Sequence, residues 1–106
     1  MRKQLQTWDN RSEFEYEGSV AEGTQIFYGT GQESYISKAQ YQALLQHFAG
    51  RTVKCGTSRT NPPEDSVGAW LQKYVQNRTL ASYVCAILIT EKYAAKGNAR
   101  WTISFK

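Results

Sequence analysis

The carboxylates of Glu13-Phe14-Glu15-Tyr16-Glu17 are the clearest candidates for chemistry in this sequence, because they alternate with aromatic residues. On a β-strand, such alternation places the three carboxylates on one face and both rings on the other. Together with Glu22 or Glu33, that face could hold a divalent cation, which prefers oxygen ligands. The same pattern is typical of a strand that buries its rings and leaves its charges in water, and this is the interpretation we expect.

The other reactive side chains do not form a recognisable site. His47 is the only histidine, and no nucleophile lies near it in the sequence. Cys55 and Cys85 have neither metal-ligand nor redox-motif spacing. No glycine motif for binding a phosphate or a dinucleotide is present in the sequence. We therefore expect no enzyme activity, no catalytic residue, no cofactor and no metal.

The cysteines and the apolar segments bear on where the chain works. Two cysteines allow one disulfide, and they also fit an intracellular chain in which both thiols stay reduced. Arg2 and Lys3 give the N-terminus a basic start, but the apolar segment of a secretory signal does not follow. The longest near-apolar stretch, Tyr83–Ile89, is far shorter than the roughly 20 residues that span a bilayer. We expect a cytoplasmic protein that does not enter membranes.

Charge divides the chain near residue 36. Residues 1–36 carry three basic and six acidic side chains, a net charge of −3, whereas residues 37–106 carry ten basic and three acidic ones, a net charge of +7. A basic block of this size attracts polyanions whatever its fold. With ordered side chains it is a candidate nucleic-acid surface. The alternative is an ordinary solvated basic surface without an anionic partner.

The length of 106 residues predicts a single α+β domain, 1–106, in three parts. Residues 1–11 are mostly polar, with one tryptophan, Trp8, and predict a loosely held arm. Residues 12–36 predict an acidic antiparallel β-meander, and residues 37–106 a basic core of three helices. The strands of the meander are expected at 13–17, 24–28 and 33–36.

Helix signals begin at Ser37. Ser37 and Gln40 fit a capping box, which predicts a helix at 38–48. Asn61-Pro62-Pro63-Glu64 fits the start of a second helix at 62–75, with Asn61 as the N-cap. The spacing of apolar residues predicts a third helix at 79–91, although the β-branched residues of 83–90 also fit a strand. The expected core of these helices contains Leu44, Leu45, Phe48, Val67, Trp70, Leu71, Val84, Ile87 and Leu88.

Strand signals complete the second part of the chain. A short strand is expected around Val53, and a C-terminal hairpin is expected to turn at Lys96-Gly97-Asn98. Its last strand, 100–105, would place Trp101, Ile103 and Phe105 on one face.

The order helix, strand, helix, helix, hairpin in residues 37–106 resembles the winged helix-turn-helix domain. The resemblance rests on this order and on the short break Gln76-Asn77-Arg78 before the third helix. It implies that the third helix enters a DNA groove and that the hairpin forms a wing. On that helix, the exposed positions would be Thr79, Ser82, Tyr83, Ala86 and Thr90. The nucleic-acid contacts that it implies are Arg59, Lys73, Arg78, Ser82, Tyr83, Lys96, Asn98 and Arg100.

We therefore expect a small non-enzymatic DNA-binding or regulatory protein, such as a transcription regulator. The third helix is a poor reader of bases, because it contains no Arg, Asn or Gln. Its nearly uniform apolar character is typical of a buried helix. The alternative is a protein-interaction module, including a homodimer, that uses this apolar helix or the edge of the meander. Basic residues gathered on one face would favour DNA, and an exposed apolar helix would favour a protein partner.

Overall fold

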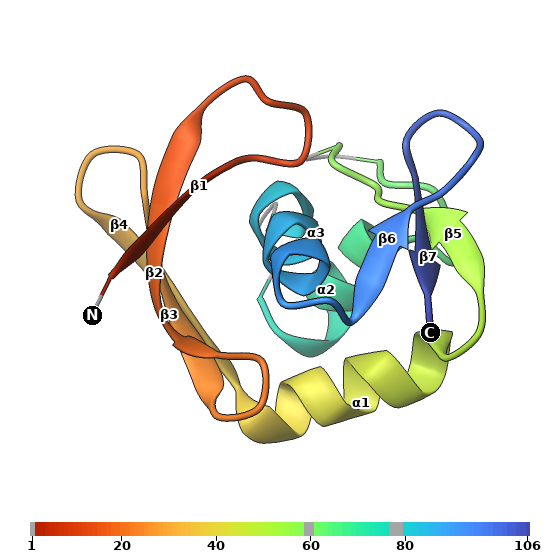
Figure 1. The fold of residues 1–106 in the computed structure, drawn as a ribbon, viewed down its shortest axis with the longest axis horizontal. Coiled ribbons are helices and arrows are strands. Elements are labelled where there is room, and N and C mark those ends of the chain that lie inside the picture. The colour runs from red at the N-terminus through yellow and green to blue at the C-terminus, as the bar shows by residue number, and fades with distance from the viewer. Residues whose placement is uncertain (1, 59–60, 77–79) are drawn as a thin grey trace.

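The computed structural model describes residues 2–58, 61–76 and 80–106, which form an α+β fold. In Figure 1, a four-stranded meander and a small three-stranded sheet flank a central helix, α3, and α1 runs beneath all three. The elements in chain order are β1 Lys3–Gln6, β2 Glu13–Ser19, β3 Gly23–Tyr28, β4 Gln32–Ser37, α1 Lys38–Phe48, β5 Thr52–Lys54, α2 Val67–Tyr74, α3 Ala81–Thr90, β6 Ala94–Lys96 and β7 Thr102–Phe105.

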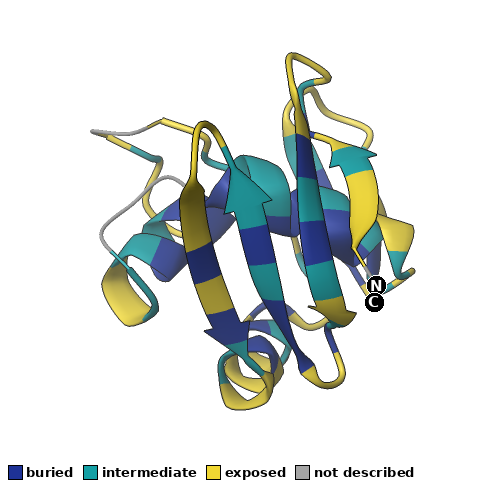
Figure 2. Ribbon diagram, turned by 90° about the vertical axis from the view of Figure 1, so that its left-hand side faces the viewer, coloured by how far each residue is buried: buried dark blue, intermediate teal, exposed yellow. Residues whose placement is uncertain are grey.

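The meander β1-β2-β3-β4 is antiparallel throughout and faces the core as its sequence predicts. Phe14 is 3% exposed and Tyr16 is fully buried, while Glu13 points to solvent. Buried and less buried residues alternate along the strands in Figure 2. A shift of register by one residue would bury carboxylates, so the alternation fixes the pairing of the strands.

The prediction of a loosely held arm at 1–11 is wrong. Residues Lys3–Gln6 form β1, which pairs with β2 so that Leu5 lies opposite Phe14. Trp8 follows and is 6% exposed, with its N–H donated to the Ser82 carbonyl of α3 at 2.9 Å. The polar composition concealed this strand, because an edge strand is held by backbone hydrogen bonds that any residue type can make.

The first helix has the predicted bounds and the predicted start. The Ser37 hydroxyl accepts the Gln40 N–H at 3.1 Å, and the Gln40 side chain accepts the Ser37 N–H at 2.9 Å, which completes the capping box. Tyr41, Leu44 and Phe48 form the buried stripe of the helix, which packs against β3 and β4. The residue spacing alone was sufficient for this element.

The second helix begins later than predicted, at Val67 rather than at 62. Asp65 has φ of 69°, a left-handed conformation that does not continue into a helix. Ser66 is the N-cap in place of Asn61, and its hydroxyl accepts the Ala69 N–H at 3.1 Å. Asn61 and Ser66 are both residue types that favour the N-cap position. The chain forms a turn at Pro63, whose carbonyl accepts the Ser66 N–H, and the helix therefore begins after Ser66.

Helix α3 spans Ala81–Thr90, which settles the choice between helix and strand for 83–90 in favour of helix. It lies between the two sheets (Figure 1), as its uniform apolar character indicated. Its buried residues join side chains of the meander, the other helices and the small sheet in one hydrophobic cluster. The expected core residues all lie in this cluster or, in the case of Leu45, pack against it.

The small sheet has the order β5-β7-β6 and is antiparallel. β6 and β7 form the predicted C-terminal hairpin, and β5 pairs with the edge of β7 that faces away from β6. From α1 onward, the element order is therefore helix, strand, helix, helix, strand, strand.

Glu91, at the C-terminus of α3, joins that helix to the meander. Its carboxylate accepts the Tyr16 hydroxyl at 2.8 Å and the Val20 N–H at 2.9 Å. Burial and the neighbouring Glu91 carboxylate raise the pKa of Tyr16 above its ordinary value. This contact fixes the orientation of the meander over α3.

Candidate functional site

The face of α3 that was expected to meet a nucleic acid is covered by the meander. The Tyr83 ring stacks on Tyr28 with 4.8 Å between centroids and meets the edge of Phe14 at 5.1 Å. The Ser82 carbonyl accepts the Trp8 N–H. Of the residues of α3, all of which the structure describes, only Thr90 is exposed.

The predicted exposure of Ser82, Tyr83 and Ala86 is therefore wrong, since all three are partly buried. The sequence of α3 was compatible with either arrangement. What covers this face is decided by the meander, whose position depends on the distant contacts of Tyr16 and Trp8.

Basic residues gather at the other side of the molecule, at the end of the small sheet where β6 turns into β7. Lys54 ends β5 and lies opposite Thr102, while Lys96 ends β6 and lies opposite Ile103. Arg100 lies in the turn itself, and all three cations are exposed. In the part of the chain that the structure describes, no carboxylate forms an ion pair with any of them.

The turn presents an exposed tryptophan among these cations. Trp101 is 47% exposed and has φ of 63°. The backbone of Trp101 is fixed, because its carbonyl accepts the Cys55 N–H at 3.0 Å. The Arg100 guanidinium lies 5.0 Å from the centroid of the indole ring. We call Lys54, Lys96, Asn98, Arg100 and Trp101 the turn-end surface.

Trp101 was expected to share one face of the last strand with Ile103 and Phe105, and this prediction is wrong. β7 begins at Thr102, so the strand alternation does not reach Trp101. The turn is tightened by the bond from the Gly97 N–H to the Thr102 carbonyl at 2.9 Å. A side chain at Gly97 would overlap the Thr102 side chain, which would have to move to make room for it. The resulting geometry turns the indole outward.

A depression of about 230 Å³ lies beside the turn. Lys96 forms part of its wall, with its ammonium 5.5 Å from the ring of the buried Trp8. Arg100 and Trp101 line the same depression. The arrangement combines a flat aromatic surface with positive charge, which suits stacking against a base beside a phosphate.

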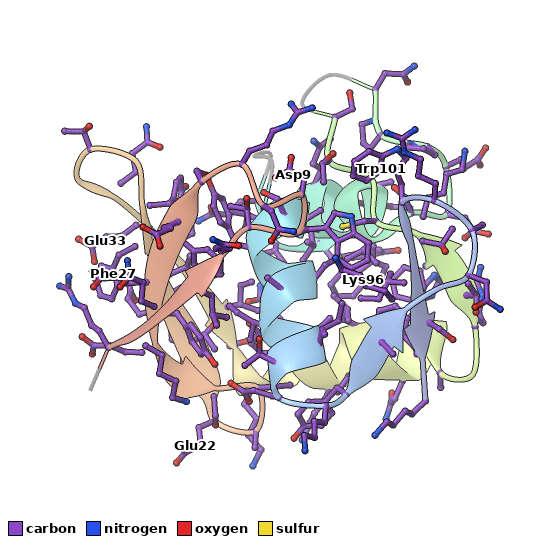
Figure 3. All side chains as sticks on the ribbon, turned by 45° about the horizontal axis from the view of Figure 1, so that its top comes forward. Asp9, Glu22, Phe27, Glu33, Lys96 and Trp101 are labelled. Carbon is purple, nitrogen blue, oxygen red and sulfur yellow. The ribbon has the colours of Figure 1, made fainter. Side chains whose placement is uncertain are left out.

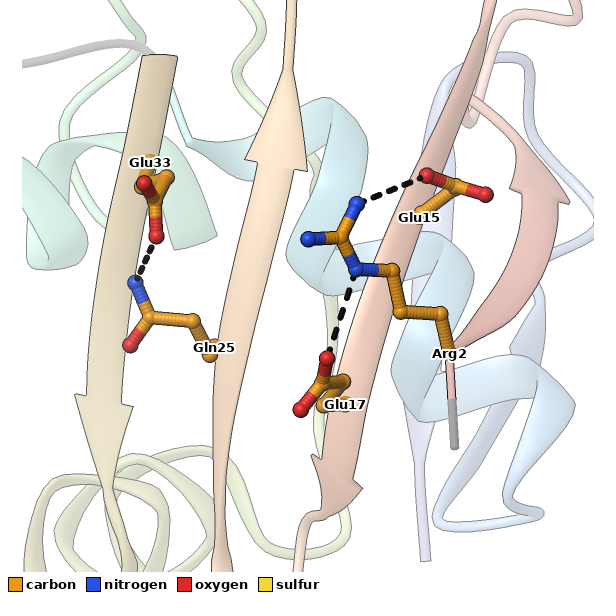
Figure 4. A network of polar contacts seen from close by, with 5 residues as sticks. All are labelled: Arg2, Glu15, Glu17, Gln25 and Glu33. Carbon is orange, nitrogen blue, oxygen red and sulfur yellow. Dashed lines mark hydrogen bonds and ion pairs between the residues drawn. The ribbon is translucent and has the colours of Figure 1, made fainter. Parts of the chain in front are cut away.

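The outer face of the meander is acidic but internally paired. Arg2 donates to Glu15 and to Glu17 at 3.3 Å each, and its guanidinium lies 3.8 Å from the centroid of the Phe27 ring. Gln25 donates to Glu33 at 3.0 Å, and Figure 4 shows both groups of contacts. A groove of about 370 Å³ on this face is larger than the depression at the turn. Its lining carboxylates would repel a phosphate, so its size does not make it the better anion site.

The remaining predicted contacts are dispersed. Lys96, Asn98 and Arg100 lie together at the turn, whereas Lys73 is exposed on α2 beside a different cavity, which His47 also lines. Arg59 and Arg78 lie outside the described residues, as does Thr79. Trp101 was not among the predicted contacts, and Lys54 ends the neighbouring strand at the same end of the sheet. Their proximity follows from the pairing of β5 with β7, which no local sequence pattern reveals.

The described residues do not place other reactive side chains around the candidates for catalysis and metal binding. His47 is exposed on α1, with its ring against Phe48. No group of three His, Cys, Asp or Glu residues that could hold a metal ion occurs among the residues described. Likewise, none of the described helices is long and apolar enough to cross a membrane.

Comparisons of the chain with protein-family models, curated proteins and solved structures found no match.

Proposed function

We propose that this chain is a small non-enzymatic nucleic-acid-binding protein, and that it binds DNA through the turn-end surface. The observation that carries the proposal is Trp101, an indole that is 47% exposed and lies beside Arg100 in a depression that Lys96 also lines. Neither cation forms an ion pair with a carboxylate among the described residues. A cation that has no protein partner is available to a phosphate, and an exposed ring is available to a base or a sugar.

The separation of charge across the molecule supports this assignment. In Figure 3, Lys96 and Trp101 lie on the half of the molecule away from Glu22, Phe27 and Glu33. A polyanion that approaches the turn therefore avoids the acidic face of the meander. Asp9, the carboxylate nearest to Trp8 in the sequence, is paired with Arg11 at 3.7 Å.

The proposed mode is that of a winged helix whose wing makes the contact. The order of elements from α1 and the β5-β7-β6 sheet resemble such a domain, in which the β6–β7 hairpin is the wing. The resemblance supports a role in DNA-dependent regulation. The covered face of α3 argues against groove reading by this helix, so we assign to the wing a binding mode directed mainly at the backbone of the nucleic acid.

Protein binding through the edge of the meander is a second candidate function. Among the described residues, no strand pairs with the outer edge of β4, and Tyr35 on this strand is 52% exposed. An open strand edge can accept a further strand from a second copy or another protein. Most apolar side chains of α3 are buried inside the chain, which argues against the use of this helix as the alternative interface expected from the sequence.

Fluorescence anisotropy with labelled duplex and single-stranded DNA, each at several salt concentrations, tests the proposal. Three phosphate contacts, from Lys54, Lys96 and Arg100, predict a log–log salt slope of about −2.7 for duplex DNA. Trp101→Phe tests the indole separately, since it should weaken binding with little change in the slope. Absence of binding to either DNA at low salt would overturn the proposal and leave the β4 edge as the better candidate.

A further inference from the structure

Cys55 and Cys85 are brought into contact in the core, although 29 residues separate them in the sequence. Cys55 follows β5 and Cys85 lies on α3; they are 1% and 0% exposed. Their sulfur atoms are 2.7 Å apart, and both thiols are free. Two sulfurs at this distance need to approach by less than about 1 Å to reach the bond length of a disulfide.

Three hydrogen bonds fix the position of Cys55, two from its backbone and one from its thiol. The Cys55 N–H donates to the Trp101 carbonyl at 3.0 Å, and the Cys55 carbonyl accepts the Gly68 N–H of α2 at 2.8 Å. A side chain at Gly68 would overlap the Gly56 carbonyl, so this close approach requires glycine. The Cys55 thiol also lies 3.5 Å from the Ala81 carbonyl. The contact between the thiols is thus built into the packing of β5, α2 and α3.

We propose that Cys55 and Cys85 form an oxidation site, at which a peroxide converts the two thiols into one intramolecular disulfide. In the first step, the thiolate of one cysteine attacks a peroxide oxygen; the O–O bond breaks, and the released hydroxide takes up the thiol proton to form water. In the second step, the other sulfur attacks the resulting sulfenic sulfur; the S–S bond forms, the S–O bond breaks, and water leaves. The peroxide gains two electrons, which the two thiols lose.

The burial of the pair determines which oxidant reaches it. A small peroxide enters a packed core far more easily than a bulky disulfide such as oxidised glutathione. Burial also raises the pKa of the Cys85 thiol well above its ordinary value, so the thiolate is scarce and the reaction is slow. Once the first sulfur is oxidised, its neighbour is already in contact, so disulfide closure competes well with further oxidation.

The crosslink would connect the small sheet to α3. It would tie the segment after β5, which is hydrogen-bonded to Trp101, to the central helix. Because it would close a long loop in the unfolded chain, we expect the oxidised protein to unfold at a temperature higher by about 10 °C. This inference does not depend on the proposed function.

The test treats the reduced, folded full-length chain with a small excess of hydrogen peroxide at neutral pH. We expect a monomer whose mass falls by two hydrogen atoms and whose thiols no longer react with iodoacetamide after denaturation. A tryptic digest should contain peptides 55–59 and 79–92 joined, and a reductant should separate them. Oxygen gained by the peptide of Cys55 or of Cys85, covalent dimers, or two thiols that still alkylate after denaturation would each overturn the proposal.

Two matched variants separate the crosslink from general oxidation. Cys55→Ala and Cys85→Ala each retain one of the two thiols, so neither should form the joined peptides or gain thermal stability in peroxide. An equal rise in the unfolding temperature of a folded single variant would contradict the assignment. If either variant fails to fold, the peptide map of the wild-type chain decides the question alone.

Discussion

The two sheets that flank α3 differ in how their charged side chains are paired. On the meander, Glu15 and Glu17 share Arg2, and Glu33 accepts from Gln25. At the turn end of the small sheet, the described residues offer Lys54, Lys96 and Arg100 no carboxylate, and two of these cations lie over indole rings instead. The charge left unpaired, rather than the total charge of a region, therefore indicates where an outside anion would bind.

The two regions also differ in how they are attached to α3. The meander is held by the buried Tyr16, which bonds to Glu91, and by the partly buried Tyr83, which stacks on Tyr28. The turn end is held mainly by backbone bonds, such as that between Cys55 and Trp101. Substitutions in the first region should therefore change stability, and those in the second should change binding. The predictions below test this division.

The largest effect is expected from Leu88→Ala in α3. Leu88 is fully buried in the cluster that both sheets share, so the cavity should lower the free energy of unfolding by about 2–5 kcal/mol. Urea unfolding followed by circular dichroism measures this change. Thr90→Ala on the same helix is the control, since Thr90 is exposed. Equal effects of the two substitutions would mean that α3 is not the shared core.

A smaller loss is expected from Glu91→Ala. The substitution removes the acceptor of the Tyr16 hydroxyl and of the Val20 N–H, so the free energy of unfolding should fall by about 1–3 kcal/mol. Hydrogen exchange should show that the loss concentrates in β2, while the amides of β7 keep their protection. Uniform loss of protection across both sheets would contradict the separate attachment of the two regions.

These contacts also mark what the sequence could predict. The capping box of Ser37 and the inward face of Phe14 and Tyr16 depend on local spacing, and both were predicted. For 83–90 the local spacing left helix and strand open, and the structure shows a helix. The strand β1, the covering of Tyr83 and the outward Trp101 depend on residues far apart in the chain, such as Glu91 and Cys55. Local rules do not determine such contacts, which is why Lys96, Asn98 and Arg100 were predicted but their neighbour Trp101 was not.

A graded effect is expected from alkaline pH. Tyr16 and Tyr41 are fully buried, and burial raises the pKa of both above the ordinary value of 10.0. Below pH 10, both tyrosines keep their protons in the folded and in the unfolded chain, so they contribute no pH dependence to the free energy of unfolding. Above pH 10, only the unfolded chain releases these protons, so the free energy of unfolding should fall by about 1.4 kcal/mol per pH unit for each tyrosine.

Urea midpoints from pH 8 to pH 11 measure this fall. Tyr16→Phe removes one of the two groups and should roughly halve the decline. An unchanged decline in this variant would show that Tyr16 ionises as easily in the folded chain as in water, against its burial beneath the meander.

The most direct test of the central claim compares two sets of charge reversals. One variant combines Lys54→Glu, Lys96→Glu and Arg100→Glu at the turn end. The matched control combines Lys38→Glu, Lys92→Glu and Lys106→Glu, which are exposed at the start of α1, after α3 and at the C-terminus. Both variants carry the same net charge, so any difference between them reflects the position of the charges.

Affinity for a labelled DNA duplex is measured by anisotropy at about 0.1 M salt, where charges more than about 10 Å away are largely screened. Circular dichroism and urea unfolding confirm that each variant is folded. We predict that the turn-end variant loses affinity by tenfold or more, on the order of the contribution of its three phosphate contacts, while the control stays close to the wild type. Equal losses in the two variants would contradict a binding site at the turn end.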